Sequence, residues 1–221
     1  MIKLNLQFFG GRGARSGGGR QGKAGGVNPN DIKSMTSLVS EREGQQKAVD
    51  EVLQVSQDFL DEFGITAEDW QLAEIDPKAG ALAFATRDGV IAINQAYFGD
   101  GKMDGAYADC VADGFHPSNG NKTALQAVTA HEMGHRLNGV IAQRSGEDFD
   151  AVATKIVSDA RKSTGDKGVV KMASKISGYA TYSNAECIAE AVSDYYCNGS
   201  KAKAQSKAVV KSVKSYLKGG N

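Results

Sequence analysis

The pentad His131-Glu132-Met133-Gly134-His135 decides the fold expected of this chain. On a helix, residues four apart lie on one face, so His131 and His135 would point two imidazoles at one metal ion. Glu132 would project beside that ion, where its carboxylate can take a proton from water. The pattern indicates a zinc-dependent hydrolase, in the first place a peptidase. The alternative is a solvated helix whose histidines bind nothing.

The residues around the pentad favour a helix that packs closely against a neighbour. The range from Lys122 to Ile141 contains no proline, and Asn121 or Thr123 can serve as its N-cap. Apolar residues recur at helical spacing at Leu125, Val128, Leu137, Val140 and Ile141, and alanines occupy positions 124, 127 and 130. This amphipathic pattern favours a buried, metal-binding helix over a solvated one.

A third zinc ligand must come from elsewhere, because hydrolytic zinc sites use three protein ligands and keep one position for water. The extended metzincin pattern needs glycine and histidine at positions that Asn138 and Ile141 occupy here, which excludes it. The other common arrangement places a glutamate on a later helix. The third ligand is therefore expected downstream of the pentad.

A second helix is predicted within the range from Tyr179 to Asn198. Ser183 or Asn184 is a suitable N-cap, and the apolar face consists of Ile188, Ala191, Val192 and Tyr195. Glu186 and Glu190 lie four apart beside this face, where a carboxylate is costly to bury unless it is ligated or hydrogen-bonded. Either both belong to a solvated face, or one binds zinc and the other accepts a hydrogen bond from a ligating histidine.

The two motifs together resemble the gluzincin zinc metallopeptidases, of which thermolysin is one. The segment from Tyr179 to Ala191 is more similar to the catalytic domain of anthrax lethal factor and to related toxin-like or phage-encoded peptidases. The resemblance implies that Glu186 is the third zinc ligand and Glu190 the hydrogen-bond partner of a ligating histidine. It also implies that Tyr179 donates to the oxyanion; Tyr182, closer to the helix start, is the second candidate. Cys187, Ile188 and Val192 replace aromatic residues usual in that family, so substrate preference does not carry over.

These expectations define an activity. With Zn²⁺ bound, Glu132 would act first as general base and then as general acid in the hydrolysis of a peptide bond by an endopeptidase. The expected partner is therefore a protein or peptide substrate. The sequence leaves the substrate and the cleavage preference open.

The segment before the pentad predicts a small sheet. Leu82-Ala-Phe-Ala-Thr and Val90-Ile-Ala-Ile-Asn flank Asp88-Gly89, which is typical of a β-hairpin turn, and Trp70 to Ile75 is a further strand. Gluzincins place an antiparallel edge strand along the cleft, and the backbone of a substrate can pair with that strand as a further strand of the sheet. The hairpin from Ala83 to Asn94 is a candidate for that edge, or it is simply part of the core.

The remaining elements are predicted to be helices and loops. Helical ranges are Asn28 to Phe63, Asp148 to Lys162, Gly168 to Ile176 and Ser200 to Leu217. The best-formed part of the first range, Gln45 to Phe63, has an apolar face at Val49, Val52, Leu53, Ser56, Phe59 and Leu60. The glycine-rich range from Gly99 to Gly120 is predicted to be a long loop, in which His116 lies at the surface or, alternatively, approaches the site from the loop before the zinc-binding helix. The fold class is α+β and zincin-like, with a small antiparallel sheet and a hairpin edge strand followed by a helical half that carries the zinc ligands.

The chain ends differ from this domain in composition. Residues 1–27 contain five basic residues and no acidic ones and are rich in glycine, so we expect a disordered leader before a single domain at 28–221. Six lysines lie between 201 and 218. The opening Leu4-Asn-Leu-Gln-Phe-Phe-Gly-Gly-Arg-Gly resembles the start of phage head-associated proteins. The basic leader could contact a phage particle or nucleic acid, or be solvated.

Cellular context follows from the cysteines and from hydropathy. Three cysteines without CxxC spacing favour a reduced protein, and no apolar run long enough for a membrane span is present. We therefore expect no membrane partner and a location in the cytoplasm of a bacterial host or in the virion. The competing functional hypothesis is a phage head-associated structural or interaction protein in which the zinc site is structural or vestigial.

Overall fold

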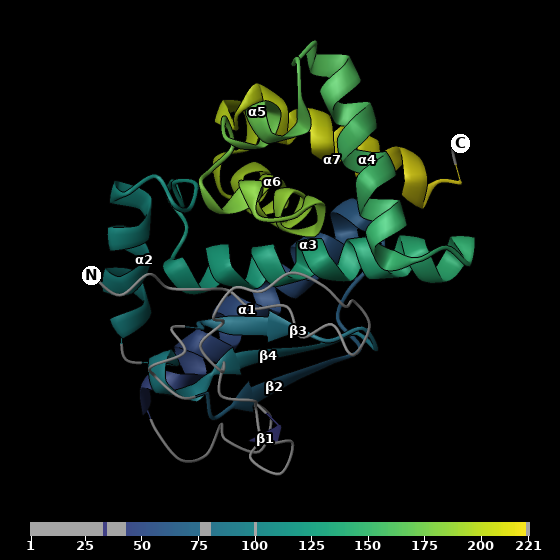
Figure 1. Cartoon of the computed structure of the whole chain (residues 1–221). Coiled ribbons are helices and arrows are strands. Elements are labelled where there is room, and N and C mark those ends of the chain that lie inside the picture. Colours follow the sequence, from purple (N-terminus) through teal and green to yellow (C-terminus); the bar gives the residue numbers. More distant parts are fainter. Residues whose placement is uncertain (1–32, 35–42, 76–80, 100, 220–221) are drawn as a thin grey trace, which may run out of the picture.

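The computed structural model describes residues 33–34, 43–75, 81–99 and 101–219, and shows an α+β fold (Figure 1). The helices are α1 (Glu43–Phe63), α2 (Lys102–Ala112), α3 (Ala124–Ser145), α4 (Phe149–Thr164), α5 (Val169–Ala173), α6 (Asn184–Asn198) and α7 (Ala204–Leu217). The strands are β1 (Lys33–Ser34), β2 (Asp69–Ala73), β3 (Ala83–Ala85) and β4 (Val90–Asn94). Short 3-10 helices lie at Gln95–Tyr97, Tyr179–Thr181 and Gly199–Lys201. The expected leader, residues 1–27, lies outside the described residues.

Helix α3 is the central element and runs between the sheet and the C-terminal helices (Figure 1). Thr123 is its N-cap, as predicted, and forms a capping box with Gln126 that satisfies free backbone N–H groups at the helix start. The helix ends at Gly146, whose φ of 69° is a left-handed conformation that glycine adopts without steric cost. All five residues of the pentad are buried. The helix therefore forms as predicted and presents the pentad to the interior.

The sheet has the strand order β1-β2-β4-β3 and is mixed, so the expectation of an antiparallel sheet was wrong in part. The predicted hairpin is confirmed: β3 and β4 pair antiparallel, and Gly89 in the turn has φ 98°. However, β2 and β4 pair parallel. After β2 the chain crosses to the edge of the sheet and forms β3. The hairpin turn then reverses the chain, so that β4 lies between β2 and β3 and runs parallel to β2.

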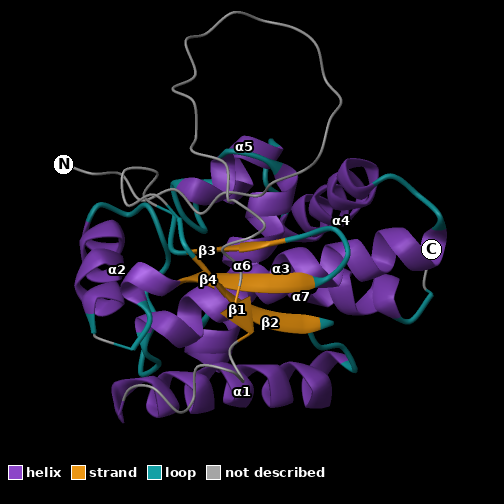
Figure 2. Cartoon of the chain, turned by 90° about the horizontal axis from the view of Figure 1, so that it is seen from below, coloured by secondary structure: helices purple, strands orange, loops and turns teal. Residues whose placement is uncertain are grey.

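Helix α1 packs along the sheet (Figure 2), and the predicted apolar face is confirmed in part, because Val49, Val52 and Phe59 are buried. Val52 and Val55 are fully buried, whereas Leu53 and Leu60 are 51% and 45% exposed. The buried face of the helix therefore packs partly against the sheet, through Val49 and Val52, and partly against α3, through Val55 and Phe59. The predicted helix start was also wrong, because Lys33–Ser34 pair with β2 as a strand and the helix begins at Glu43.

Helix α2 occupies part of the range that was predicted to be a loop, so that prediction was wrong. Its buried residues Met103, Tyr107 and Cys110 recur at intervals of four and three and pack in one cluster with α1, the sheet and the start of α3. Gly101, with φ 72°, begins the helix. The helix places the segment that follows it, including His116, against α3 and α6.

The C-terminal helices form the other layer, and a helix lies within or close to each of the three predicted ranges. The Asp148 side chain caps α4 by accepting hydrogen bonds from the N–H groups of Asp150 and Ala151. The Ser183 side chain caps α6 by accepting one from the N–H of Glu186. The largest buried cluster joins α3, α4, α6 and α7. Within the described part of the chain, no helix is both long and apolar enough to cross a membrane.

Candidate active site

The candidate site forms where α3 and α6 touch. Gly134, inside the pentad, lies against Ala189: a Cβ at position 134 would be 2.6 Å from the Ala189 Cα. Real side chains do not pack at this distance, so only glycine permits the contact. The close approach brings Glu186, three residues before Ala189, over the face of α3 that carries the two histidines.

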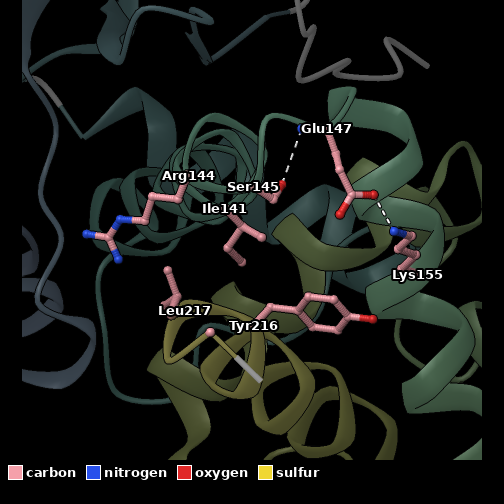
Figure 3. A pocket seen from close by; sticks show the side chains of 8 residues that line it. Ile141, Arg144, Ser145, Glu147, Lys155, Tyr216 and Leu217 are labelled. Carbon is pink, nitrogen blue, oxygen red and sulfur yellow. Dashed lines mark hydrogen bonds and ion pairs between the residues drawn. The ribbon is translucent and has the colours of Figure 1, made fainter. Parts of the chain in front are cut away.

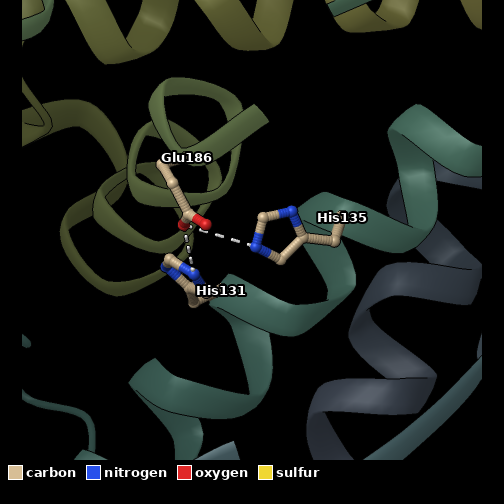
Figure 4. Close-up of side chains that lie close together, drawn as sticks. All are labelled: His131, His135 and Glu186. Carbon is tan, nitrogen blue, oxygen red and sulfur yellow. Dashed lines mark ion pairs between the residues drawn. The ribbon is translucent and has the colours of Figure 1, made fainter. Parts of the chain in front are cut away.

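His131, His135 and Glu186 form a group that can hold one metal ion (Figure 4). One ligand atom from each lies within 4.8 Å of the other two. The Glu186 Oε2 atom is 3.2 Å from His131 Nε2 and 3.4 Å from His135 Nε2. Tetrahedral zinc with bonds of about 2.0–2.1 Å places neighbouring ligand atoms about 3.3 Å apart. The observed separations fit this geometry.

The chemistry of these donors also fits a cation. His131 Nε2 and Glu186 Oε2 are buried and have no hydrogen-bond partner in the described structure. Burial lowers the pKa of His131, but the nearby carboxylates of Glu186 and Glu190 outweigh burial and raise it to about 10. Burial raises the pKa of Glu186, yet attraction to His135 and His131 lowers it to about 2. The site therefore attracts positive charge, whether a proton or a metal cation.

Glu190 lies behind the metal group and holds His131 in place. His131 Nδ1 donates to Glu190 Oε1 at 2.8 Å, which leaves Nε2 directed at Glu186. Ser177 Oγ donates to Glu190 Oε2 at 2.6 Å. Burial raises the pKa of Glu190, but His116 and His131 outweigh it and hold this pKa below its usual range. The carboxylate is therefore ionised and accepts these hydrogen bonds.

The structure corrects the prediction for His116, which is not a surface residue. It is 2% exposed, and its Nδ1 donates to Glu190 Oε1 at 3.0 Å. The glycines around it indicated a loop, but α2 and the helix pair bury that loop. Its partner lies 74 residues away in the sequence, so no local pattern could have shown the contact. Ser177 was missed for the same reason, since a serine before a helix is more often a cap or a turn residue.

Glu132 lies beside the metal group and beside β3. It is 2% exposed, and burial raises its pKa above the usual value, partly offset by His131 and His135. A hydrogen bond from the backbone of Ala85 to the carboxylate also lowers this pKa. The residues of β3 are buried, so the hairpin belongs to the core. Addition of a substrate strand along β3 stays a prediction.

The two candidate tyrosines occupy different environments. Tyr179 is 3% exposed and stacks on His131 with ring centroids 5.9 Å apart. Burial and the nearby carboxylates of Glu186 and Glu132 raise its pKa above the usual value, so its hydroxyl keeps its proton and can donate. Tyr182 is 61% exposed and lies next to Tyr179, with ring centroids 5.1 Å apart. Tyr179 is therefore the tyrosine in contact with the site.

A separate hollow of about 620 Å³ lies at the far end of α3 (Figure 3). Ile141, Arg144, Tyr216 and Leu217 are among the residues that line it, and an ion pair between Lys155 and Glu147 closes one side. None of the metal-binding candidates lines it. The hollow is therefore not part of the candidate site.

This site defines the class of metal-dependent hydrolases. Two histidines and one carboxylate leave one position of a tetrahedral metal for water, and the buried glutamate beside them can take a proton from that water. Comparison with known proteins leads to the particular family. Residues 45–191 match the model of peptidase family M48, so the chain belongs to this family. M48 peptidases are zinc metallopeptidases, and the protein is a hydrolase with zinc as its cofactor. Neither the curated proteins nor the solved structures gave a match.

Proposed function

We propose that the protein is a zincin-like endopeptidase of gluzincin type, with its catalytic domain at residues 28–221. His131, His135 and Glu186 bind the zinc, and Glu132 is the general base and acid. The observation that carries this proposal is the buried group of three ligand atoms within 4.8 Å of one another. Its spacing suits tetrahedral zinc, and its location on two packed helices makes it rigid.

The roles of the protein side chains follow from their environment. Bound zinc polarises a substrate carbonyl and lowers the pKa of water. Glu132 takes a proton from the attacking water on its carboxylate and passes it to the leaving amine. Burial supports this role because it raises the pKa of Glu132 toward the range in which a carboxyl group exchanges protons at neutral pH.

Tyr179 supplies a hydrogen bond to the oxyanion that develops on the substrate carbonyl. Its hydroxyl is held among carboxylates that keep it protonated, and its ring is fixed by His131 and Phe115. A donor that is already oriented stabilises developing charge more than mobile water does. Tyr182 lies at the exposed rim and is the second candidate for this role.

The resemblance to the lethal factor catalytic domain and to phage-encoded peptidases supports a phage or mobile-element origin. The segment that carries the phage-like sequence, residues 4–13, lies outside the described residues. On this proposal the enzyme acts on proteins or peptides in the cytoplasm of a bacterial host or within the virion, and its basic leader contacts the phage particle or nucleic acid.

The test is metal analysis together with peptide hydrolysis for the wild type and for Glu132→Gln. The wild type should bind about one zinc per chain and cleave peptides from a host-cell lysate. Glu132→Gln should keep the zinc, because Glu132 is not a ligand, and lose about 10²–10⁴-fold in activity. Stoichiometric zinc without any cleavage by the wild type would refute the peptidase and favour a structural role for the metal.

A further inference from the structure

Glu190 receives hydrogen bonds from three separate segments of the chain. His131 comes from α3, Ser177 from the segment before the 3-10 helix Tyr179–Thr181, and His116 from the segment after α2. The two histidines share Oε1, at 2.8 Å and 3.0 Å, while Ser177 occupies Oε2. Because a carboxylate oxygen offers two lone-pair directions, His116 occupies one at Oε1 and leaves the other to His131.

His116 is itself held rigidly. Its ring is stacked on Tyr107 of α2, with centroids 5.3 Å apart and planes 3° from parallel. Phe115 and Tyr179 contact it edge-on, with centroids 5.0 Å and 5.5 Å away. Its Nε2 atom is buried without a hydrogen-bond partner in the described structure. The contact with Glu190 is therefore the polar interaction that its side chain makes there.

The segment after α2 is also joined to the segment that carries Tyr179. The N–H of Gly178 donates to Gly114 O at 2.8 Å, and the N–H of Tyr179 donates to Phe115 O at 3.0 Å. A Cβ at Gly178 would lie 3.3 Å from Gly114 O, so the two backbones are closely packed. Helix α2 and the segment that follows it thus form one wall of the site.

We infer that His116 is a positioning residue of the metal centre: by fixing the carboxylate of Glu190, it sets the direction in which His131 presents Nε2 to zinc. The inference rests on the proposed function, since it takes His131 as a zinc ligand. A ligating histidine depends on the partner of its other nitrogen for its tautomer and its ring orientation. Without His116, one lone pair of a fully buried carboxylate loses its donor, and Ser177 alone then holds Glu190 in its orientation toward His131.

Substitutions at position 116 can separate this hydrogen bond from packing. In His116→Asn the side-chain amide nitrogen can take the place of Nδ1, whereas in His116→Gln the amide reaches the place of Nε2. His116→Leu fills the space without a donor. We expect His116→Leu and His116→Gln to weaken zinc binding about 10–100-fold and His116→Asn to restore most of the affinity.

The readouts are the zinc dissociation constant, measured by competition with a chromophoric chelator, and the absorption spectrum of the Co²⁺-loaded full-length protein. The spectrum reports ligand geometry and should shift in His116→Leu but not in His116→Asn. Tyr107→Phe is the matched control, because it removes the hydrogen bond to Pro117 O in the same segment and keeps the stacked ring. It should lower thermal stability and leave zinc affinity and the Co²⁺ spectrum unchanged.

Three outcomes would overturn the inference: wild-type zinc affinity in His116→Leu, equal affinities in His116→Asn and His116→Gln, or an equal loss in Tyr107→Phe. The Asn and Gln comparison decides the matter even if His116→Leu does not fold. A wild-type protein that binds no zinc would instead refute the proposed function. The two failures are thereby distinguished.

Discussion

Gly134 and Ala189 bring α3 and α6 into backbone contact between the two candidate ligands His131 and His135. A methyl group at position 134 would lie 2.6 Å from the Ala189 Cα and 3.3 Å from the Ala189 nitrogen. The helices can therefore approach this closely only because residue 134 is a glycine, and the position of Glu186 depends on that close approach.

Gly134→Ala should separate the helices and displace Glu186 from the histidines. We expect a loss of about 1–3 kcal/mol in unfolding free energy, typical of overpacking, together with weaker zinc binding. Chemical denaturation measures the unfolding free energy, and zinc titration measures the affinity. Gly139→Ala on the same helix is the control, because its Cβ would meet only a Phe149 ring atom at 4.0 Å. A Gly134→Ala protein as stable as the control would contradict the contact.

The two glutamates of α6 should respond differently to removal. Glu186→Ala takes away the proposed third zinc ligand and should abolish tight zinc binding, whereas Glu190→Ala removes the partner of His131 and should weaken binding about 10–100-fold. Zinc affinity under identical conditions distinguishes them. If Glu190→Ala is the more damaging, the ligand assignment is reversed.

Tyr179→Phe should lower kcat with little change in KM, because the hydroxyl acts on the oxyanion and not on the bound substrate. Loss of one oxyanion donor costs about 10²–10³-fold in rate. Tyr182→Phe is the control, since that side chain is 61% exposed. Steady-state kinetics on a peptide cleaved by the wild type provide the measurement, and a larger effect in Tyr182→Phe would exchange the two roles.

Removal of zinc should destabilise the protein, because the ligands come together only in the folded state. A ligand at 100 times its dissociation constant stabilises the fold by about 2.7 kcal/mol. For a domain of this size such a loss lowers Tm by about 5–10 °C. Thermal unfolding with a chelator, followed by zinc replacement, measures the effect. His131→Ala serves as the comparison and should show no response to the chelator.

Asp166 predicts a pH dependence that is independent of the metal centre. The hydrogen bond from Lys175 is the largest cause that lowers the pKa of this carboxyl group below its ordinary 3.8, and Thr164 and Gln205 add to it. A lowered folded-state pKa stabilises the protein above the unfolded value, and this contribution disappears as the pH falls through the folded-state value. The Tm difference between wild type and Asp166→Asn should therefore be largest near neutrality and shrink below about pH 4. A difference that is constant with pH would exclude the carboxylate as its cause.

The sequence predicted those parts of the structure that local patterns determine. The α3 cap at Thr123, the α6 cap at Ser183 and the hairpin turn at Gly89 all depend on residues within a few positions of one another. Helix α2 also had a local signal, the spacing of Met103, Tyr107 and Cys110, but the glycines around it indicated a loop. Those glycines begin and end the helix instead.

Long-range contacts explain what could not be predicted. The parallel pairing of β2 with β4 depends on where the hairpin docks, which the alternating pattern of each strand leaves open. The burial of His116 depends on Glu190, and the outward orientation of Leu53 on how α1 lies against the sheet. The candidate ligands were visible in advance because their chemistry is local to two helices, whereas the network that orients them is not.

The hydrogen bonds of Glu190 also connect segments that are synthesised far apart in time. They join α6 to residues 59 and 74 positions earlier, so large loops must close before the carboxylate has its partners. A growing chain that has completed α3 but not α6 holds two histidines without the third ligand or the group that aligns them. The metal centre is thus incomplete until α6 has been made and packed against α3, and a nascent chain that lacks α6 has no complete site with which to capture zinc.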